Sequence, residues 1–254
     1  MAKRHHKRYI NELISHIEPT SVMAEAYRSL RTNIQFTSVE NPVRTVLITS
    51  AGPREGKTTT LVNIGITMAQ TGSRVILFDT DLRRPMLHKI FSLPNATGLS
   101  NALVEFKNIE LIAANTSVPN LYVAMSGPVP PNPAELLIAP NMGLIIEDAK
   151  KKFDVVLLDS PPLLSVTDAL ILGKYTDGII LVVQGSRTIK EAAARATEVV
   201  KEHKLKIIGA VLNDVNLARE NYDYYFYYGY YGKSKKYGYA EVESTKRSGD
   251  LTKI

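Results

Sequence analysis

The hydrophobic positions of this chain fall into short, almost continuous apolar runs separated by longer segments of mixed polarity. The apolar runs cover residues 43–50, 74–79, 121–125, 153–159, 178–183 and 206–212. The segments with a helical pattern cover residues 57–70, 142–152, 167–174 and 188–204. Continuous apolar strands that alternate with helices are typical of a parallel sheet covered on both faces. We therefore expect an α/β fold with a mostly parallel sheet flanked by helices, preceded by a separate helix at about 24–36.

Tyrosine is concentrated near the C-terminus. Nine of the 13 tyrosines lie between residues 222 and 239, in a segment without a helical or strand period that three glycines interrupt. We expect residues 216–254 to form a flexible tyrosine-rich tail. The nine residues are Tyr222, Tyr224, Tyr225, Tyr227, Tyr228, Tyr230, Tyr231, Tyr237 and Tyr239.

Part of the net charge of +6 is concentrated at the N-terminus. Four basic residues lie within the first eight positions, so the rest of the chain is nearly neutral. A basic arm can bind a membrane, nucleic acid or an acidic partner, but we favour a solvated arm over residues 1–20. The chain has no cysteine, no run near the ~20 apolar residues of a membrane span, and no apolar segment after its basic start. We expect a cytoplasmic protein without disulfides, with a folded domain over residues 21–215.

The first predicted strand ends in the sequence AGPREGKT, residues 51–58. A loop of this kind points its backbone N–H groups at phosphate oxygens and leads into a helix N-terminus. Lys57 would contact the β- and γ-phosphates of ATP, and the Thr58 hydroxyl would bind Mg²⁺. A chance glycine-lysine turn is the alternative, which the position between a strand and a helix disfavours. The predicted nucleotide contacts are Gly52, Pro53, Arg54, Glu55, Gly56, Lys57, Thr58 and Thr59.

Two further predicted strands end in aspartates. Asp79 and Asp81 are alternate residues, so they share a face while the chain is extended, and Asp159 follows four apolar residues in the manner of a Walker-B strand. Strand carboxyl ends form the ligand edge of a parallel sheet, where such carboxylates can bind Mg²⁺ or accept a hydroxyl proton. The alternatives are a pair of loop-capping aspartates bound to Arg83 or Arg84, and, for Asp159, a strand that simply ends in a turn.

Two asparagines are weaker candidates. Asn213 follows the last predicted strand and would contact the adenine, or would only tolerate the turn. Asn132 lies in the proline-rich segment GPVPPNPAELL, residues 127–137, and would cap a helix that starts at Pro133. A rigid structural connection is the interpretation that we favour for this segment.

The phosphate loop, the Asp79-x-Asp81-x-Arg83 pattern, the run LLDSPP, the segment GPVPPNPAELL and the tyrosine-rich tail together resemble bacterial tyrosine kinases of the capsule and exopolysaccharide type. The resemblance covers about residues 20–240. It implies that Lys57, Thr58 and Asp159 hold ATP and Mg²⁺, that Asp79 is a candidate base for the tyrosine hydroxyl, and that Asp81 lies near the metal. No feature of the sequence ranks Asp79 above Asp81 as the base. The resemblance also implies autophosphorylation of the tail tyrosines and regulation of polymer assembly and export.

The same resemblance implies partners. Glu25, Arg28 and Arg31 lie on one helical face, where an intrahelical salt bridge is the simple interpretation. In the family this pattern builds a ring of subunits, so that the tail of one subunit enters the active site of its neighbour. Because it has no predicted membrane span, the chain resembles the split Gram-positive form of these kinases. In that form a separate transmembrane activator with a cytoplasmic tail recruits the kinase to the inner face of the membrane. A tyrosine phosphatase and protein substrates are further implied, and nucleic acid is not.

Phosphorylation would change the charge of the tail. Nine phosphotyrosines would add roughly −14 to −18 charges. We therefore expect phosphorylation to dissociate the oligomer.

Two other functions fit parts of the sequence. One is a switch ATPase of the septum-positioning and chromosome-partitioning type, but those proteins carry a signature lysine where this chain has Gly52, and the tail would have no role. The other is a non-enzymatic, ATP-sensing scaffold whose tail self-associates or binds RNA. Basic residues are sparse within the tyrosine-dense part, which disfavours RNA binding.

Overall fold

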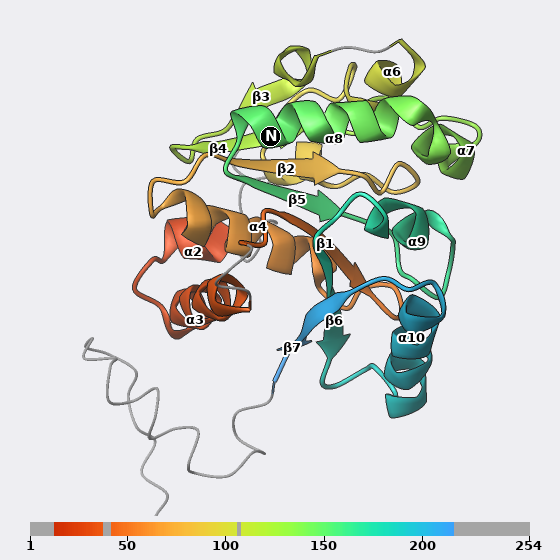
Figure 1. Ribbon diagram of the computed structural model, residues 1–254. Helices are drawn as coiled ribbons and strands as arrows, with labels where there is room; N and C mark the ends of the chain where they lie inside the picture. The colour runs from red at the N-terminus through yellow and green to blue at the C-terminus, as the bar shows by residue number, and fades with distance from the viewer. Residues whose placement is uncertain (1–12, 38–41, 106–107, 216–254) are drawn as a thin grey trace, which may run out of the picture. The chain divides into compact units, whose positions relative to one another are not determined.

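A seven-stranded sheet lies at the centre of the structure, a computed structural model that describes residues 13–37, 42–105 and 108–215 (Figure 1). The strand order is β3-β4-β2-β5-β1-β6-β7, and every neighbouring pair is parallel except β3 and β4. The predicted, mostly parallel α/β sheet is therefore confirmed. The strands are β1 (Thr45–Ser50), β2 (Val75–Asp79), β3 (Ala113–Asn115), β4 (Leu121–Ala124), β5 (Val155–Asp159), β6 (Gly178–Gln184) and β7 (Ile207–Asn213).

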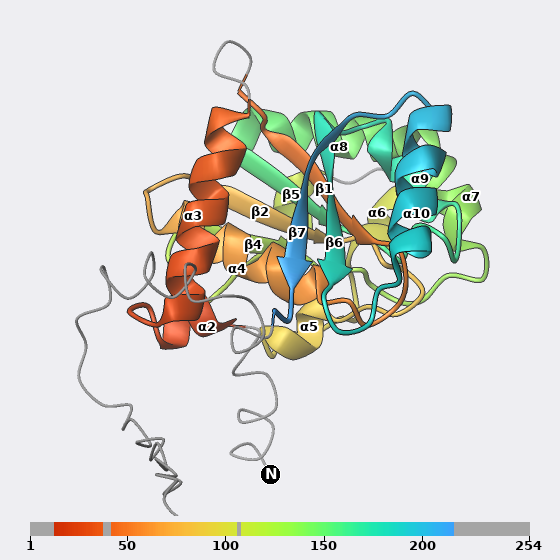
Figure 2. The same cartoon turned by 90° about the horizontal axis from the view of Figure 1, so that it is seen from below.

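Helices cover both faces of the sheet (Figures 1 and 2). Residues of α3, α4 and α5 pack on one face, and residues of α6 to α10 pack on the other. The helices are α2 (Ile14–Ile17), α3 (Val22–Phe36), α4 (Lys57–Ala69), α5 (Leu87–Ile90), α6 (Leu99–Val104), α7 (Pro133–Ile138), α8 (Pro140–Lys152), α9 (Asp168–Gly173) and α10 (Lys190–Glu202), with a 3₁₀ turn η3 (Ile109–Leu111).

The core follows the two-residue period of the strands. In β2, Ile76 and Phe78 join the apolar cluster under α6 to α10, whereas Val75 and Leu77 join the cluster under α3 to α5. All four side chains are fully buried. Because both faces of each central strand are covered, these strands are mostly apolar, and this produces the nearly continuous runs in the sequence.

The structure adds elements that the sequence pattern did not predict. Helix α2 packs against α4, where the Ser15 amide donates to the Asn63 side chain over 2.9 Å. The last residues of the segment assigned to a basic arm are therefore packed into the body. The Asn132 prediction is wrong in one respect: this residue precedes α7, but its side chain donates to Glu135 and does not cap the helix. Among the helices in the described ranges, none is long and apolar enough to cross a bilayer.

Candidate active site

The carboxyl ends of the three central strands β2, β5 and β1 meet at the phosphate loop. The loop connects β1 to α4 and ends at Gly56, whose φ of 90° favours glycine. A Cβ atom at Gly56 would lie 2.0 Å from the Asn213 side-chain nitrogen, so this residue must be glycine on two grounds. Arg54 also has a positive φ, of 64°, which is uncommon for a residue with a side chain. The backbone of the loop is thus held in the curled form that an anion site requires.

The first two residues of α4 contact the acidic strand ends. The Thr58 hydroxyl donates to Asp159 Oδ2 over 2.7 Å, and Lys57 Nζ lies 3.7 Å from Asp81 Oδ2. Both contacts join the helix N-terminus to carboxylates at the ends of neighbouring strands, Asp159 in β5 and Asp81 two residues beyond β2. The structure therefore brings together the lysine, the hydroxyl and the acidic residues that the sequence motifs indicate.

Asp79 has the most perturbed carboxyl of the site. It is fully buried, and its Oδ2 accepts the backbone amides of Met86 and Leu87 over 3.0 and 2.9 Å. Its Oδ1 has no hydrogen-bond partner among the described residues. Burial, together with the nearby charges of Asp159 and Asp81, raises the pKa of Asp79 to about 8. A proton is thus held easily at this carboxyl.

Asp159 and Asp81 lie in different surroundings. Burial raises the pKa of Asp159 to about 6, although Lys57 and the Thr58 hydroxyl oppose the shift. Asp81 has partners on both oxygens, because Oδ1 accepts the Arg84 amide over 3.0 Å and Oδ2 faces Lys57. The loop-capping alternative is thus present in part, because Asp79 and Asp81 both accept loop amides, but the described residues contain no ion pair of either aspartate with Arg83 or Arg84.

The arginine that follows the pair binds elsewhere. Arg83 makes a two-pronged ion pair with Asp168, with Nε to Oδ2 at 2.9 Å and Nη2 to Oδ1 at 3.0 Å. Asp168 is fully buried at the start of α9, and the pair raises the pKa of Arg83. This contact fixes the end of the loop that carries Asp81. Sequence spacing contained no signal for Asp168, which lies 85 residues away.

Two contacts between residues far apart in the sequence hold the phosphate loop from the other side. The Thr188 hydroxyl donates to Glu55 Oε1 over 2.6 Å, and the Asn213 side chain donates to the Glu55 carbonyl oxygen over 3.1 Å. Glu55 is buried, and its Oε2 has no partner in the described part of the chain. Asn213 therefore supports the loop itself, and its contact with an adenine stays a prediction.

The donor set fits Mg²⁺ only with help from a bound nucleotide. Thr58 and Asp159 present hard oxygens, and Asp159 Oδ1 is buried without a partner in residues 13–37, 42–105 and 108–215. Those residues contain no group of three or more His, Cys, Asp or Glu side chains placed to hold a metal ion. Mg²⁺ commonly binds through one or two carboxylates and completes its shell with substrate phosphates and water. The residues thus suit a metal that arrives with ATP.

The helix residues predicted for oligomerisation have partners within the chain. Arg28 Nε donates to Glu25 Oε2 over 2.7 Å, as the intrahelical alternative expects, and Arg28 also donates to the Pro19 carbonyl oxygen over 2.7 Å. Arg31 donates to the Thr67 carbonyl oxygen of α4 over 3.0 Å. A role of these residues between subunits stays a prediction. The nine predicted phosphoacceptor tyrosines lie outside the described residues.

Comparisons with known proteins connect this geometry to a family. Residues 51–212 match the family model described as an AAA domain. The chain is 41% identical to tyrosine-protein kinase YwqD of Bacillus subtilis over 226 residues, which are 89% of this chain and 95% of the relative. It is similar to the kinase domain of the Escherichia coli tyrosine kinase ETK, with a TM-score of 0.79, 29% identity, and coverage of 89% and 84% of the two chains. The cell division ATPase MinD of Pyrococcus furiosus is less similar, with a TM-score of 0.57, 27% identity, and coverage of 66% and 71%.

Proposed function

Because this chain belongs to the bacterial tyrosine kinases of the capsule and exopolysaccharide type, we propose that it transfers the γ-phosphoryl group of ATP to the tyrosines of its own C-terminal cluster. The observation that carries the proposal is the arrangement around the phosphate loop. Lys57 and Thr58 lie against Asp81 and Asp159, while Asp79 keeps one buried oxygen without a partner among the described residues. A phosphate site, a metal site and a proton acceptor are thus combined at one sheet edge.

The loop would bind the triphosphate through its backbone N–H groups and through Lys57, which lies at the start of α4. Thr58 and Asp159 would hold Mg²⁺, with Asp81 close by. When bound, the metal would neutralise charge on the phosphate oxygens. The Lys57–Asp81 contact of 3.7 Å is long for a salt bridge, so Lys57 can turn to a phosphate at small cost.

Asp79 is the stronger candidate for the base. A free tyrosine hydroxyl has a pKa of about 10, so a carboxyl with an ordinary pKa near 4 accepts its proton poorly. The pKa of Asp79 is raised to about 8, so the carboxylate, once it has lost its own proton, is a stronger proton acceptor than an ordinary aspartate, and its Oδ1 has no other partner in the described part of the chain. Asp81, in contrast, has both oxygens engaged by Arg84 and Lys57. Asp79 would accept the hydroxyl proton at Oδ1.

We further propose that transfer occurs between subunits of a homo-oligomer, in a ring that uses Glu25, Arg28 and Arg31. A tail of nearly 40 residues reaches on the order of 100 Å when extended, so distance does not limit this transfer. A transmembrane activator with a cytoplasmic tail would recruit the kinase to the inner face of the membrane. Protein substrates and a counteracting tyrosine phosphatase would complete the regulation of exopolysaccharide or capsule assembly and export.

The test is an intact-mass measurement of the purified chain after incubation with ATP and Mg²⁺, with and without the cytoplasmic tail of the candidate membrane partner. We expect several phosphate-sized additions that map to the tail tyrosines and are absent from Lys57→Ala. Nucleotide hydrolysis without added mass, even with the partner present, would instead support a switch ATPase. That alternative has the weaker structural likeness, and Gly52 stands where its signature lysine would be.

A further inference from the structure

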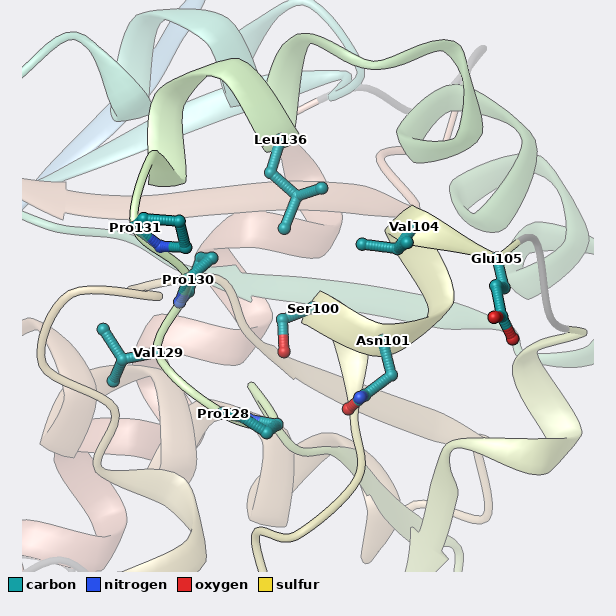
Figure 3. Close-up of a pocket in the computed structure, with 9 residues that line it drawn as sticks. All are labelled: Ser100, Asn101, Val104, Glu105, Pro128, Val129, Pro130, Pro131 and Leu136. Carbon is teal, nitrogen blue, oxygen red and sulfur yellow. The ribbon is translucent and has the colours of Figure 1, made fainter.

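A groove of about 380 Å³ lies between α6, α7 and the proline-rich segment that follows β4 (Figure 3). Val104 and Val129 are 71% and 59% exposed, which is high for apolar residues that line one depression. Neither residue belongs to the nucleotide site. The apolar lining is formed by Val104, Pro128, Val129, Pro130, Pro131 and Leu136.

The wall of this groove is rigid. The Ser100 amide donates to the Ser126 carbonyl oxygen over 2.8 Å, and the Gly127 amide donates to the Asn95 side chain over 2.9 Å. Gly127 has a φ of 75°, and a Cβ atom there would lie 2.6 Å from Ser100 Oγ. A groove that is already formed loses little conformational entropy when it binds a ligand.

One polar atom of the groove points to the kind of ligand. Ser100 lines the groove, is 6% exposed, and its Oγ has no hydrogen-bond partner within the described ranges. In Figure 3 its side chain lies in the middle of the lining residues. Buried hydroxyl groups are normally hydrogen-bonded. An apolar groove with one such hydroxyl suits a tyrosine, which combines a flat apolar ring with a polar tip.

The groove lies close to Asp79, the proposed base. Phe78 of β2 pairs with Ala124 of β4. Asp79, the last residue of β2, therefore lies beside Met125, the first residue after β4. Pro128 follows Met125 by three residues, a separation of at most about 10 Å along the chain. A peptide that presents one tyrosine to Asp79 therefore reaches the groove with a residue about three positions away.

The tail contains this spacing repeatedly. Five tyrosine pairs are three residues apart in the sequence, namely 222/225, 224/227, 225/228, 227/230 and 228/231. Three residues span about 10 Å in an extended peptide and about 9 Å in a polyproline II helix, where they also share one face. Because each tyrosine side chain adds its own length to this backbone span, two tyrosines three residues apart can reach from Asp79 to the groove.

We infer that the groove binds a second tyrosine of the tyrosine-rich segment of another copy of the chain, three residues from the tyrosine presented to Asp79. This inference rests on the proposed function. The ring would pack on Val104, Leu136 and the prolines, and the hydroxyl would lie toward Ser100, whose buried Oγ would turn to bond to it. Glu105, which also lines the groove, would repel a phosphotyrosine, so the groove favours segments that are not yet phosphorylated.

The first test separates an enzyme copy from an acceptor copy. The enzyme copy has its nine tail tyrosines replaced by serine, and the acceptor copy carries Lys57→Ala with its natural tail. Val104→Gln in the enzyme copy should slow phosphate transfer to the acceptor about tenfold, whereas the matched change Leu111→Gln should leave the rate unchanged. Leu111 is 72% exposed and lies outside the groove. Equal rates for the two variants would overturn the inference.

The second test varies the acceptor tail. Tyr225 is kept as the sole acceptor, and other tail aromatics become serine except for two phenylalanines. In one tail the two phenylalanines lie three residues on either side of Tyr225, through Tyr222→Phe and Tyr228→Phe. In the control tail they are adjacent to Tyr225, through Tyr224→Phe and the natural Phe226. Transfer to the first tail should be about tenfold faster than transfer to the control tail. Equal transfer to both tails would overturn the inference. If the natural tail takes up no phosphate from an otherwise unaltered enzyme copy, the proposed function fails instead.

Discussion

Asp79 of β2 lies directly opposite Asp159 of β5 in the register of the parallel sheet. Both carboxyls are buried, and neighbouring strands are only about 4.8 Å apart. Two negative charges at this separation in a poorly solvated site disfavour each other, so a proton is retained at the pair. A cation bound beside the pair would offset this repulsion and favour release of the proton, which would leave a carboxylate free to act as a base.

The first prediction concerns the pH dependence of stability in the protein without ATP and Mg²⁺. The pKa of Asp79 is about 8 in the folded chain, against about 3.9 in an unfolded one. The folded state then binds more protons between these values, so the free energy of unfolding should fall as the pH rises through this range. Asp159, with a pKa of about 6, adds to the same trend.

Melting temperatures of the wild type and Asp79→Asn, measured from about pH 5 to about pH 8.5, check this prediction. The variant should lose less stability over the range, because its side chain does not titrate. A carbon-13 titration of the aspartate carboxyls provides an independent readout. A variant whose melting temperature falls as steeply as that of the wild type would contradict the assignment.

A second prediction concerns the Thr58 hydroxyl, which lies 2.7 Å from Asp159 Oδ2. Thr58→Ser keeps the hydroxyl and should retain activity within a few-fold. Thr58→Val keeps the shape but removes the oxygen, so autophosphorylation should fall by on the order of 10²-fold and the Mg²⁺ requirement should rise. The measurement is phosphate per chain at several Mg²⁺ concentrations. Equal activity of the serine and valine variants would show that this hydroxyl is not a metal ligand.

The strongest sequence signals came from repeated or local patterns. The central strands were predictable because both of their faces are buried, and the phosphate loop because its residues are adjacent. Strand β3 has no such signal, because Ala113–Asn115 is only three residues long and only partly buried. A strand of this length has no period to detect.

Contacts between residues that are far apart in the sequence cannot be predicted from local patterns. Thr188 and Glu55 are 133 residues apart, and only the fold brings them within 2.6 Å. The ranking of Asp79 above Asp81 depends on which carboxylate oxygens accept backbone amides and which face Lys57. A spacing of two residues contains neither fact, so the sequence left both aspartates as candidate bases.

A third prediction tests the Arg83–Asp168 pair as a support of the loop that carries Asp81. Asp168→Asn breaks a two-pronged contact with a buried carboxylate and should destabilise the fold by about 1–3 kcal/mol, since Arg83 is partly exposed. Activity should fall further than stability explains, because the loop loses its anchor. The matched control Glu147→Gln removes an exposed pair with Lys150 and should cost less than about 0.5 kcal/mol.

A double-mutant cycle of Arg83→Gln and Asp168→Asn, read by chemical denaturation and by autophosphorylation, isolates the pair. The double variant should be little worse than either single variant in both readouts. Fully additive losses of activity would show that the two residues act independently and that the pair does not position the loop.

A fourth prediction concerns the charge of the assembly. Each phosphotyrosine adds about −1.5 to −2 charges, so nine would add roughly −14 to −18 to a chain with a net charge of +6. Tails that are crowded around a ring would then repel one another and leave the acidic site edge formed by Asp79, Asp81 and Asp159. Because Arg31 is held by the Thr67 carbonyl oxygen and Arg28 by Glu25, the proposed contact helix is already fixed within each subunit. Its intrachain contacts need not change when subunits separate.

Phosphorylation should therefore lower the molecular mass of the assembly without unfolding the subunits. Static light scattering before and after incubation with ATP and Mg²⁺ measures the mass, and intact-mass spectrometry of the same sample counts the phosphates. Lys57→Ala given ATP is the control for nucleotide binding alone and should keep its mass. Raised salt should weaken the effect, since repulsion between exposed charges is screened over about 8–10 Å at physiological ionic strength. An assembly that keeps its mass when its tails are fully phosphorylated would contradict this prediction. That result would mean that the contacts between subunits of the ring outweigh the repulsion between the tails.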